Sequence, residues 1–543
     1  MRKRHPQKDN ILLVNITRLG DMLQATPTIA GMKMENPECR ITVLVEKQFE
    51  SICYAIPNVD EVVSIDLGMT VRSLAREQEG IVDAYEYVTE MVDDLRSRNF
   101  DYTLNMSSSA YTALLLRLVG IERRGGWTAD EEGHRVIESD WAQLFATSVF
   151  HQNRQYNSLN LVDVFRCSAD VETHPHKLLL NISEEARRKA GLLLEEIGFP
   201  KDGPFIMVQA GASQAKRQWD PSLFIEFIRI LTEEHGCRIL LSGTGKELPI
   251  IEPILQNSNR QRVFSVAGKT GIPELGALLE MSELLVTGDT GPMHMSVAAG
   301  TPVVSMFLAS AFGFETGPYS PGNIVLQPVI GCGPCNPNKA CSKPECHDTI
   351  SPQLLARLTM LRYAGDFTTL PPDLADERNV VIYRSNFDQH GFCDLTPLNR
   401  ASLGTIERYR SAYRRLWLDD LGDIGLQEQT QQRLKITEGG IEGLQEVVRA
   451  ADEGVHLVTR LQELIHDSSS PPSELGKTSD AMTELDRKIE QIGYFYPHLG
   501  PLTRMFIFGK ENILGSDPYD LASQMKNIYQ ALGRRSDKLA RYF

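Results

Sequence analysis

The chain has 543 residues, a formal net charge of −15, 42% hydrophobic residues and 23% charged residues. This length predicts two to four domains, and this composition is that of a globular protein with a sizeable core. The excess of acid argues against a large nucleic-acid surface. No apolar run approaches the roughly 18 residues of a transmembrane helix, and the basic start MRKRHPQKDN leads into a patterned domain, unlike a signal peptide. We therefore expect a cytoplasmic protein.

The N-terminal part alternates between two patterns. Runs rich in β-formers lie at 11–16, 41–46, 62–66 and 102–106, with helical patterns between several of them, for example at 83–98. Strands separated by helices predict βαβ units and a parallel sheet. The pattern weakens after Gly125, and we predict a first α/β domain over residues 1–175.

The alternation resumes in a second part of the chain. A helix is predicted at 183–198, where Ser183 is a good N-cap, and strand-like runs follow at 205–209, 238–243, 263–268, 284–288 and 302–307. These elements predict a second α/β domain over residues 176–375. Residues 400–465 and 476–543 are rich in Leu, Glu, Arg, Gln and Tyr at helical spacing, so we predict a mostly α-helical extension of unknown role over residues 376–543. SSSPPSELG (468–476) is typical of a linker or loop.

The stretch LLVTGDTGPMHMSVAAGTPVVSMF (284–307) carries the strongest signal for a binding site. It predicts a strand that ends and a helix that begins around Asp289, and ligands of open α/β sheets bind at the carboxyl ends of strands. Gly291 lets the backbone approach a ligand, Pro292 suits the first helical position, and Thr290 can cap the helix. A helix N-terminus suits a phosphate, while Asp289 suits sugar hydroxyls. The stretch therefore suggests a sugar nucleotide; a capped strand–turn–helix without a ligand is the alternative.

A second strand–loop–helix pattern lies at 11–33, with Arg18-Leu19-Gly20-Asp21 in the loop. Asp21 is placed near the start of the helix. It could act as a general base on an acceptor hydroxyl from the opposite domain. The alternative is an acidic first-turn residue favoured by the helix dipole.

These two stretches resemble glycosyltransferase family 9, the ADP-heptose–lipopolysaccharide heptosyltransferases. The resemblance rests on GDMLQATPTIAGMK and TGDTGPMHMSVAAGTPVV, and three other motifs agree: GASQAKRQWD (211–220), LSGTGKE (241–247) and ETGPYSP (315–321). The motifs occur in the family's order, and the resemblance covers about residues 10–365. It leaves the C-terminal extension unexplained.

The resemblance implies a GT-B fold, in which two Rossmann-like domains face a cleft. Residues 1–175 would bind the acceptor and residues 176–375 the nucleotide sugar. Such enzymes invert the anomeric centre in one displacement and need no catalytic cofactor or metal. Asp21 is the implied base, and Glu247 is implied to hold the ribose hydroxyls. The full set of implied donor-binding residues is Gly20, Glu247, Asp289, Thr290, Gly291, Pro292, Met293 and His294.

The cation of the site departs from the family pattern. The family places it two positions before the tryptophan, which is Arg217 before Trp219 here, with Lys216 beside it and Asp220 in place of the usual proline. Arginine can clamp a diphosphate bidentately, so both Arg217 and Lys216 are catalytic candidates. The alternative for Lys216 and Arg217 is a solvated basic pair without a ligand. The alternative for His294 is a histidine at a helix start whose ring is satisfied by backbone contacts.

Four cysteines cluster in GCGPCNPNKACSKPECHD, at Cys332, Cys335, Cys341 and Cys346. Four thiols in this spacing can close tetrahedrally on one structural ion, zinc by default or iron. His347 is a substitute ligand, and free thiols or disulfides are the alternative. A similar finger occurs in relatives that attach heptose to autotransporter proteins and form large oligomers. That likeness keeps a protein acceptor and a homo-oligomer open.

Two classes of function follow. The first is an inverting glycosyltransferase that moves a heptose-like sugar from an ADP-sugar to a hydroxyl of a lipopolysaccharide core or other surface glycan, with a protein acceptor as its variant. A lipid-linked acceptor would bring peripheral contact with the inner face of the cytoplasmic membrane. The second is a non-catalytic GT-B scaffold that binds a partner through the helical extension. Neither hypothesis involves nucleic acid.

Overall fold

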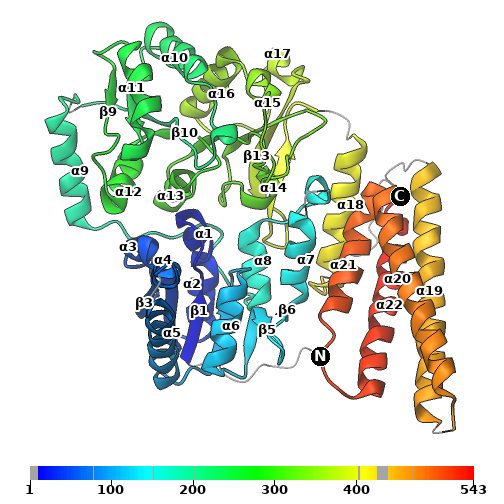
Figure 1. The fold of residues 1–543 in the computed structure, drawn as a ribbon. Coiled ribbons are helices and arrows are strands. Elements are labelled where there is room, and N and C mark those ends of the chain that lie inside the picture. Colours follow the sequence, from blue (N-terminus) through cyan, green and yellow to red (C-terminus); the bar gives the residue numbers. More distant parts are fainter. Residues whose placement is uncertain are drawn as a thin grey trace. The chain divides into compact units, whose positions relative to one another are not determined.

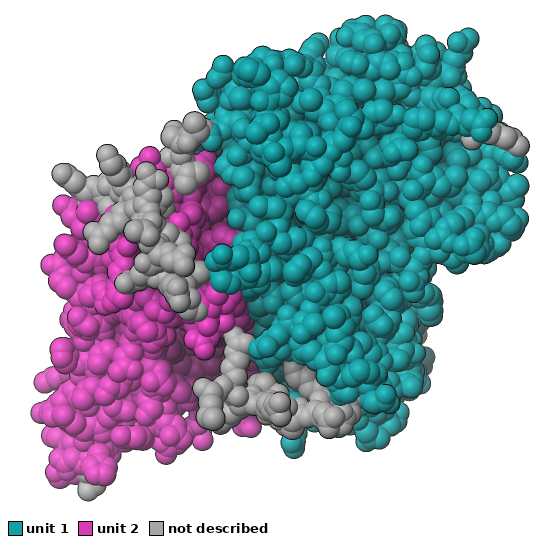
Figure 2. Space-filling model, turned by 180° about the vertical axis from the view of Figure 1, so that it is seen from behind, with its two compact units in different colours: residues 1–125, 159–401 teal, residues 126–158, 402–543 magenta. Residues whose placement is uncertain are grey.

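The computed structural model describes residues 10–76, 79–150, 152–200, 202–400, 404–424, 438–467 and 469–543. The chain forms two compact units (Figure 2): residues 1–125 with 159–401, called unit 1, and residues 126–158 with 402–543, called unit 2. Parts of the predicted helical extension, at 401–403, 425–437 and 468, lie outside the described residues.

The first sheet of unit 1 is parallel, with β1 between β2 and β4 and with β3 beyond β2. Its strands are β1 (Asn10–Val14), β2 (Arg40–Glu46), β3 (Glu61–Ile65) and β4 (Tyr102–Asn105). Its helices are α1 (Leu19–Gln24), α2 (Thr26–Glu35), α3 (Glu50–Cys53), α4 (Leu67–Leu74), α5 (Gly80–Ser97), α6 (Ala110–Val119) and α8 (Leu161–Ser168). The order of the strands reverses between β1 and β4, which is where ligands of such sheets bind.

The second sheet of unit 1 has the order β14-β13-β12-β11-β10-β7-β8-β9. Its strands are β7 (Ile206–Gln209), β8 (Ile239–Ser242), β9 (Val263–Ser265), β10 (Leu284–Gly288), β11 (Val303–Met306), β12 (Ile324–Pro328), β13 (Val380–Phe387) and β14 (Cys393–Pro397). All neighbours from β9 to β12 are parallel. The strand order reverses between β7 and β10, so this sheet has its own switch point. Both sheets are flanked by buried apolar clusters.

Helices connect the strands of the second sheet. They are α9 (Glu184–Glu196), α10 (Pro221–Arg229), α11 (Leu248–Gln256), α12 (Ile272–Met281), α13 (Gly291–Ala299), α14 (Gly313–Thr316), α15 (Glu345–Thr349), α16 (Pro352–Ala364) and α17 (Pro372–Ala375). The predicted cap is confirmed, because Ser183 Oγ accepts from Ala186 N at 3.1 Å. Asp220 caps α10 through a hydrogen bond from Ser222 N at 2.8 Å, which gives the residue that replaces the family's proline a structural role.

Residues 380–397 lie in the segment expected to be helical, yet they form β13 and β14. These strands extend the second sheet by antiparallel pairing with β12. Val380 and Ile382 are fully buried there. The helical part of the extension starts later, with α18 at Thr405. The two boundaries between the three domains drawn from the sequence stay predictions.

Unit 2 combines a β-hairpin with helices. Its elements are β5 (Arg124–Ala129), whose first two residues belong to unit 1, β6 (Arg135–Ile137), α7 (Asp140–Val149), α18 (Thr405–Asp420), α19 (Glu438–His466), α20 (Pro472–Phe495), α21 (Gly500–Glu511) and α22 (Pro518–Arg541). The long helix α19 packs against α20 and α22 (Figure 1). Within the described ranges, no helix combines the length and apolar character needed to cross a bilayer.

Candidate functional site

Asp21 lies at the switch point of the first sheet. It sits in the first turn of α1, which follows β1, and its Oδ2 accepts from Arg18 N at 3.2 Å. The buried Asn15 donates from Nδ2 to the Asp21 carbonyl at 3.1 Å. Ile16 N donates to Ser107 Oγ, just beyond β4, at 2.9 Å. These contacts tie the Asp21 loop to the two strands that flank the switch.

The predicted donor loop joins β10 to α13. Thr290 occupies the N-cap position, but its Oγ1 pairs with Thr287 Oγ1 at 2.9 Å and does not cap the described helix. The predicted side-chain cap is therefore wrong, because a second hydroxyl competes for the Thr290 oxygen. Gly291 and Pro292 form the start of α13, and Met293 and His294 are buried within it.

The starts of α1 and α13 lie side by side (Figure 1). A Cβ built on Gly20 would lie 2.8 Å from His294 Cδ2, and one on Gly291 would lie 2.7 Å from Leu19 Cδ2. Both distances are below any normal carbon–carbon contact, so each glycine permits the close approach of the two helices. The contact brings the Asp21 loop of the first sheet to the donor loop of the second.

His294 is the buried residue at this contact. Its side chain is 4% exposed, and Nδ1 has no hydrogen-bond partner among the described residues. The alternative of a histidine fully satisfied by the backbone therefore does not apply. Burial lowers the pKa of His294 to about 4, and the charge of Asp21 opposes this shift only in part. At neutral pH the ring is thus uncharged.

Arg217 and Asp289 form an ion pair across the switch point of the second sheet. Arg217 Nη1 lies 2.9 Å from Asp289 Oδ2, and the side chains are 14% and 11% exposed. Arg217 follows β7 and Asp289 follows β10, so the pair spans the two strands at which the order reverses. The structure therefore brings Arg217 to the donor loop.

Two residues that the sequence analysis did not single out hold this pair. Ser310 is fully buried, and its Oγ accepts from Arg217 Nε at 2.8 Å. Thr316 donates from Oγ1 to Asp289 Oδ1 at 3.1 Å. Thr316 belongs to the ETGPYSP motif, so that motif could have identified it as a site residue. No local sequence pattern marks Ser310.

Lys216 points elsewhere. Its ammonium group donates to three backbone carbonyls, those of Asn336, Pro337 and Lys339, at 3.0, 2.8 and 2.8 Å. These carbonyls belong to the cysteine-rich segment, which we define as residues 331–347. The structure therefore separates the two basic neighbours and does not bring Lys216 to Asp289.

Glu247 lies at the carboxyl ends of β7 and β8. Its Oε1 accepts from Gln209 Nε2 at 3.2 Å, and its Oε2 accepts from Thr244 N at 2.7 Å. A side chain at Gly211 would clash with the Glu247 carboxylate, so the glycine makes room for the acid. Because β7 neighbours both β8 and β10, Glu247 stands along the same edge of the sheet as the Arg217–Asp289 pair.

The four clustered cysteines are present as free thiols. The pKa of Cys335 is raised to about 11, first by burial and then by the neighbouring thiols Cys332, Cys346 and Cys341, so the four lie near one another. As placed, however, no group of three or more His, Cys, Asp or Glu side chains in the described ranges could hold a metal ion. The predicted zinc or iron site is therefore not formed by these side chains.

His347 is not available as a substitute ligand through Nε2. That nitrogen lies 2.9 Å from the Lys216 carbonyl. Because a carbonyl can only accept, His347 Nε2 carries the hydrogen and donates it. The ring thus serves the turn that carries Lys216.

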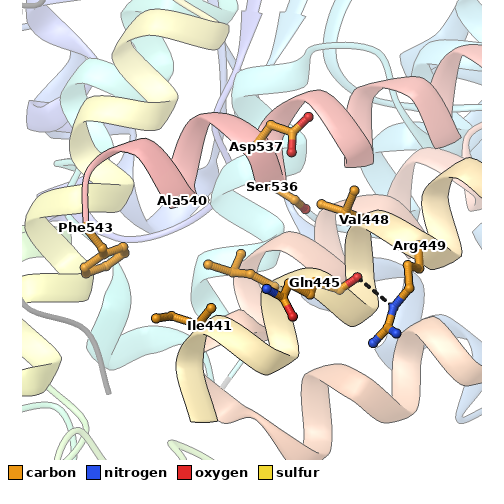
Figure 3. Close-up of a pocket in the computed structure, with 9 residues that line it drawn as sticks. Ile441, Gln445, Val448, Arg449, Ser536, Asp537, Ala540 and Phe543 are labelled. Carbon is orange, nitrogen blue, oxygen red and sulfur yellow. Dashed lines mark hydrogen bonds between the residues drawn. The ribbon is translucent and has the colours of Figure 1, made fainter. Parts of the chain in front are cut away.

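A pocket of about 560 Å³ lies within unit 2 (Figure 3). Its lining is Ile441, Leu444, Gln445, Val448, Arg449, Ser536, Asp537, Ala540 and Phe543. The lining is mainly apolar, and Arg449 Nε donates within its own helix to the Gln445 carbonyl at 3.3 Å. None of the residues predicted to bind the donor lines this pocket.

The sequence profile of glycosyltransferase family 9 (heptosyltransferase) matches residues 88–346, which include the donor loop and Arg217. The chain thus contains a glycosyltransferase family 9 region at these residues. It is therefore a glycosyltransferase, and its GT-B fold carries a helical C-terminal region.

Individual relatives agree with this assignment. Lipopolysaccharide heptosyltransferase 3 of Escherichia coli K12 is 24% identical over 297 residues, which is 54% of this chain and 80% of the relative. The lipopolysaccharide core heptosyltransferase OpsX of Haemophilus influenzae is 24% identical over 340 residues, covering 62% of this chain and 88% of the relative. The crystal structure of a family 9 glycosyl transferase from Veillonella parvula superposes with a TM-score of 0.53 at 17% identity, covering 66% of this chain and 98% of that one.

Proposed function

We propose that this family 9 enzyme transfers a heptose-like sugar, with inversion, from an ADP-sugar to a hydroxyl of a lipopolysaccharide core. The observation that carries the proposal is the contact between α1 and α13. It places Asp21, at the switch point of one sheet, next to the helix that begins beside Asp289, at the switch point of the other. A single-displacement transfer requires a base and a bound donor held close together, and this contact brings a candidate base and the predicted donor loop near each other.

The reaction follows from this arrangement. The hydroxyl oxygen of the acceptor attacks the anomeric carbon from the face opposite the diphosphate. Asp21 accepts the proton of that hydroxyl during the attack. The bond from that carbon to the diphosphate oxygen breaks, and ADP leaves with the bonding electrons. Negative charge grows on the leaving diphosphate. Arg217 and the N–H groups at the start of α13 stabilise it.

The Arg217–Asp289 pair supports a division of roles at the donor. Arg217 and Thr316 both contact the Asp289 carboxylate, so we assign Asp289 to hold the arginine in place as well as to receive sugar hydroxyls. Glu247 is assigned to the ribose hydroxyls, because its carboxylate stands at the same edge of the sheet. Gly20, Thr290, Gly291, Pro292, Met293 and His294 shape the junction of the two loops.

The proposed acceptor is a lipopolysaccharide core. The names of the relatives favour a lipopolysaccharide core, and such a lipid-linked acceptor implies action at the inner face of the cytoplasmic membrane. A protein acceptor is the variant. Mass spectrometry of surface glycans and of glycosylated proteins from a deletion strain separates the two, because only the true acceptor loses its heptose.

A structural zinc or iron ion at Cys332, Cys335, Cys341 and Cys346 is a separate proposal. It rests on the spacing of the cysteines in the sequence. The described side chains do not form the site as placed, so binding would require them to move together, and no step of the reaction depends on it. Elemental analysis of the purified protein tests it: one equivalent of metal, lost in Cys341→Ser, supports the ion. Analytical ultracentrifugation of the same preparation tests the predicted homo-oligomer.

The decisive test of the function is Asp21→Asn. We expect loss of transfer from ADP-heptose to a lipopolysaccharide core by about 10²–10⁴-fold, the usual worth of a general base, with ADP affinity unchanged. Asp93→Asn is the matched control, because Asp93 is 65% exposed on α5. Transfer at the wild-type rate in Asp21→Asn would remove Asp21 as the base.

The scaffold alternative makes a different prediction. A protein that has lost donor binding gains no thermal stability from millimolar ADP, whereas a ligand at 100 times its Kd stabilises by about 2.7 kcal/mol. A wild-type protein with no shift in melting temperature and no transfer would favour the scaffold.

A further inference from the structure

The cysteine-rich segment and the turn that carries Arg217 are joined at several points. Residues 215–217 form one 3₁₀ turn, η3 (Ala215–Arg217), in which Lys216 and Arg217 point to different partners. Lys216 Nζ uses its donors on three carbonyls of the segment, and Arg217 reaches Asp289 and Ser310. Because Lys216 and Arg217 are adjacent in one short turn, the position of one side chain is linked to that of the other.

The segment also contacts this turn in the reverse direction. His347 Nε2 donates to the Lys216 carbonyl at 2.9 Å. Trp219, which is 1% exposed, donates from Nε1 to the His347 carbonyl at 3.1 Å. The cysteine-rich segment therefore contacts both the side chain and the backbone carbonyl of Lys216.

The cysteine-rich segment also contacts the loop that carries Ser310, the hydrogen-bond acceptor of Arg217. Cys335 N donates to the Ala309 carbonyl at 2.9 Å, and the next residue, Ser310, accepts from Arg217 through Oγ at 2.8 Å. The segment thus contacts both the turn that presents the guanidinium and the loop that binds it.

We propose that Lys216 is a positioning residue, which fastens the cysteine-rich segment to η3 and thereby fixes Arg217 against Asp289 and Ser310. Charge-assisted hydrogen bonds are stronger than neutral ones, and the tetrahedral ammonium group can serve three carbonyls at once. Loss of this group leaves three carbonyls without their cation and frees the segment to open. That the fixed guanidinium then serves a diphosphate rests on the proposed function.

The test is Lys216→Met, with Lys343→Met as the matched control. Lys343 lies in the same segment, is 82% exposed and pairs with Glu345. Iodoacetamide labelling of Cys335 and Cys346 reports opening of the segment, and phenylglyoxal labelling of Arg217 reports release of the guanidinium, both read by peptide mass spectrometry. Cys237, a half-buried thiol beside Met360, is the internal reference.

We expect Lys216→Met to speed all three labelling reactions by about ten-fold, which corresponds to about 1.4 kcal/mol of lost local stability. Cys237 and the Lys343→Met variant should keep wild-type rates. Unchanged labelling of the cysteines in folded Lys216→Met would overturn the clamp, and faster cysteine labelling with unchanged Arg217 labelling would overturn the coupling. The milder Lys216→Gln, expected to give intermediate rates, replaces Lys216→Met if that variant does not fold.

ADP separates this inference from the proposed function. If Arg217 binds the diphosphate, millimolar ADP slows phenylglyoxal labelling of Arg217 in the wild-type protein. If ADP gives no protection, the donor assignment fails, while the labelling rates of the variants without nucleotide still decide the positioning role.

Discussion

Gly20→Ala tests the helix contact on which the proposed site depends. The added Cβ would lie 2.8 Å from His294 Cδ2 and 3.3 Å from His294 Nε2, whereas carbon atoms in contact are normally about 3.5–4.0 Å apart. His294 is 4% exposed and has little room to move. The two helices must therefore separate by roughly 0.7 Å, the difference between these contact distances.

The destabilisation by this clash is partly offset by the higher helix propensity of alanine. Overpacking of this kind destabilises by about 1–3 kcal/mol, while alanine in place of glycine in a helix contributes up to about 1 kcal/mol. The difference between these two terms is a net loss of about 1 kcal/mol, within a range of roughly 0–2 kcal/mol. Because Asp21 adjoins Gly20, the shift also displaces the proposed base, and misplacement by about 1 Å can cost 10²-fold in rate.

A double-mutant cycle measures this effect. Urea unfolding and transfer rates are compared for the wild type, Gly20→Ala, His294→Ala and the double variant. Removal of the imidazole should relieve most of the loss, which gives a coupling of about 1 kcal/mol or more. Gly191→Ala on α9 is the control, since a Cβ there meets nothing within 4 Å, and it should be neutral or stabilising. If Gly20→Ala costs the same with and without His294, the contact is not the cause.

Three further predictions follow from the same unit. His294 has a pKa of about 4 in the folded state against 6.5 for an unperturbed histidine; the unfolded chain therefore takes up the proton first, and stability should fall by about 2 kcal/mol between pH 7 and pH 5. Urea unfolding of His294→Gln should lack that loss, and an equal pH dependence in both proteins would contradict it. Asp163→Asn should destabilise by about 3 kcal/mol in the same assay, since it leaves the buried Arg166 without its counter-ion; a loss below about 1 kcal/mol, the worth of one neutral hydrogen bond, would count against this pairing. Thr316→Val removes a hydrogen bond to Asp289 and should weaken ADP binding about five-fold by calorimetry, whereas unchanged affinity would separate Thr316 from the donor site.

Much of the fold was predictable because its signals are local. Runs of β-formers and amphipathic helices specify parallel strands and their connections, and Ser183 marks a helix start through a hydrogen bond that spans three residues. The strand–loop–helix patterns that carry Asp21 and Asp289 were predictable for the same reason, since each is readable within about two dozen residues; the roles of these residues stay predictions.

The sequence alone determined the α/β alternation, the place of the two loops and the family motifs that they carry. Only the tertiary structure decided that β13 and β14 join the second sheet, that α1 and α13 approach closely at Gly20 and Gly291, and that Arg217 reaches Asp289 while Lys216 binds the cysteine-rich segment. Each of these contacts joins residues far apart in the chain. The hydrogen bond between Arg217 and Ser310, for example, joins residues 93 positions apart. Local patterns act over a few residues, whereas the direction of two adjacent basic side chains depends on the carbonyls and carboxylates that the folded chain brings to them.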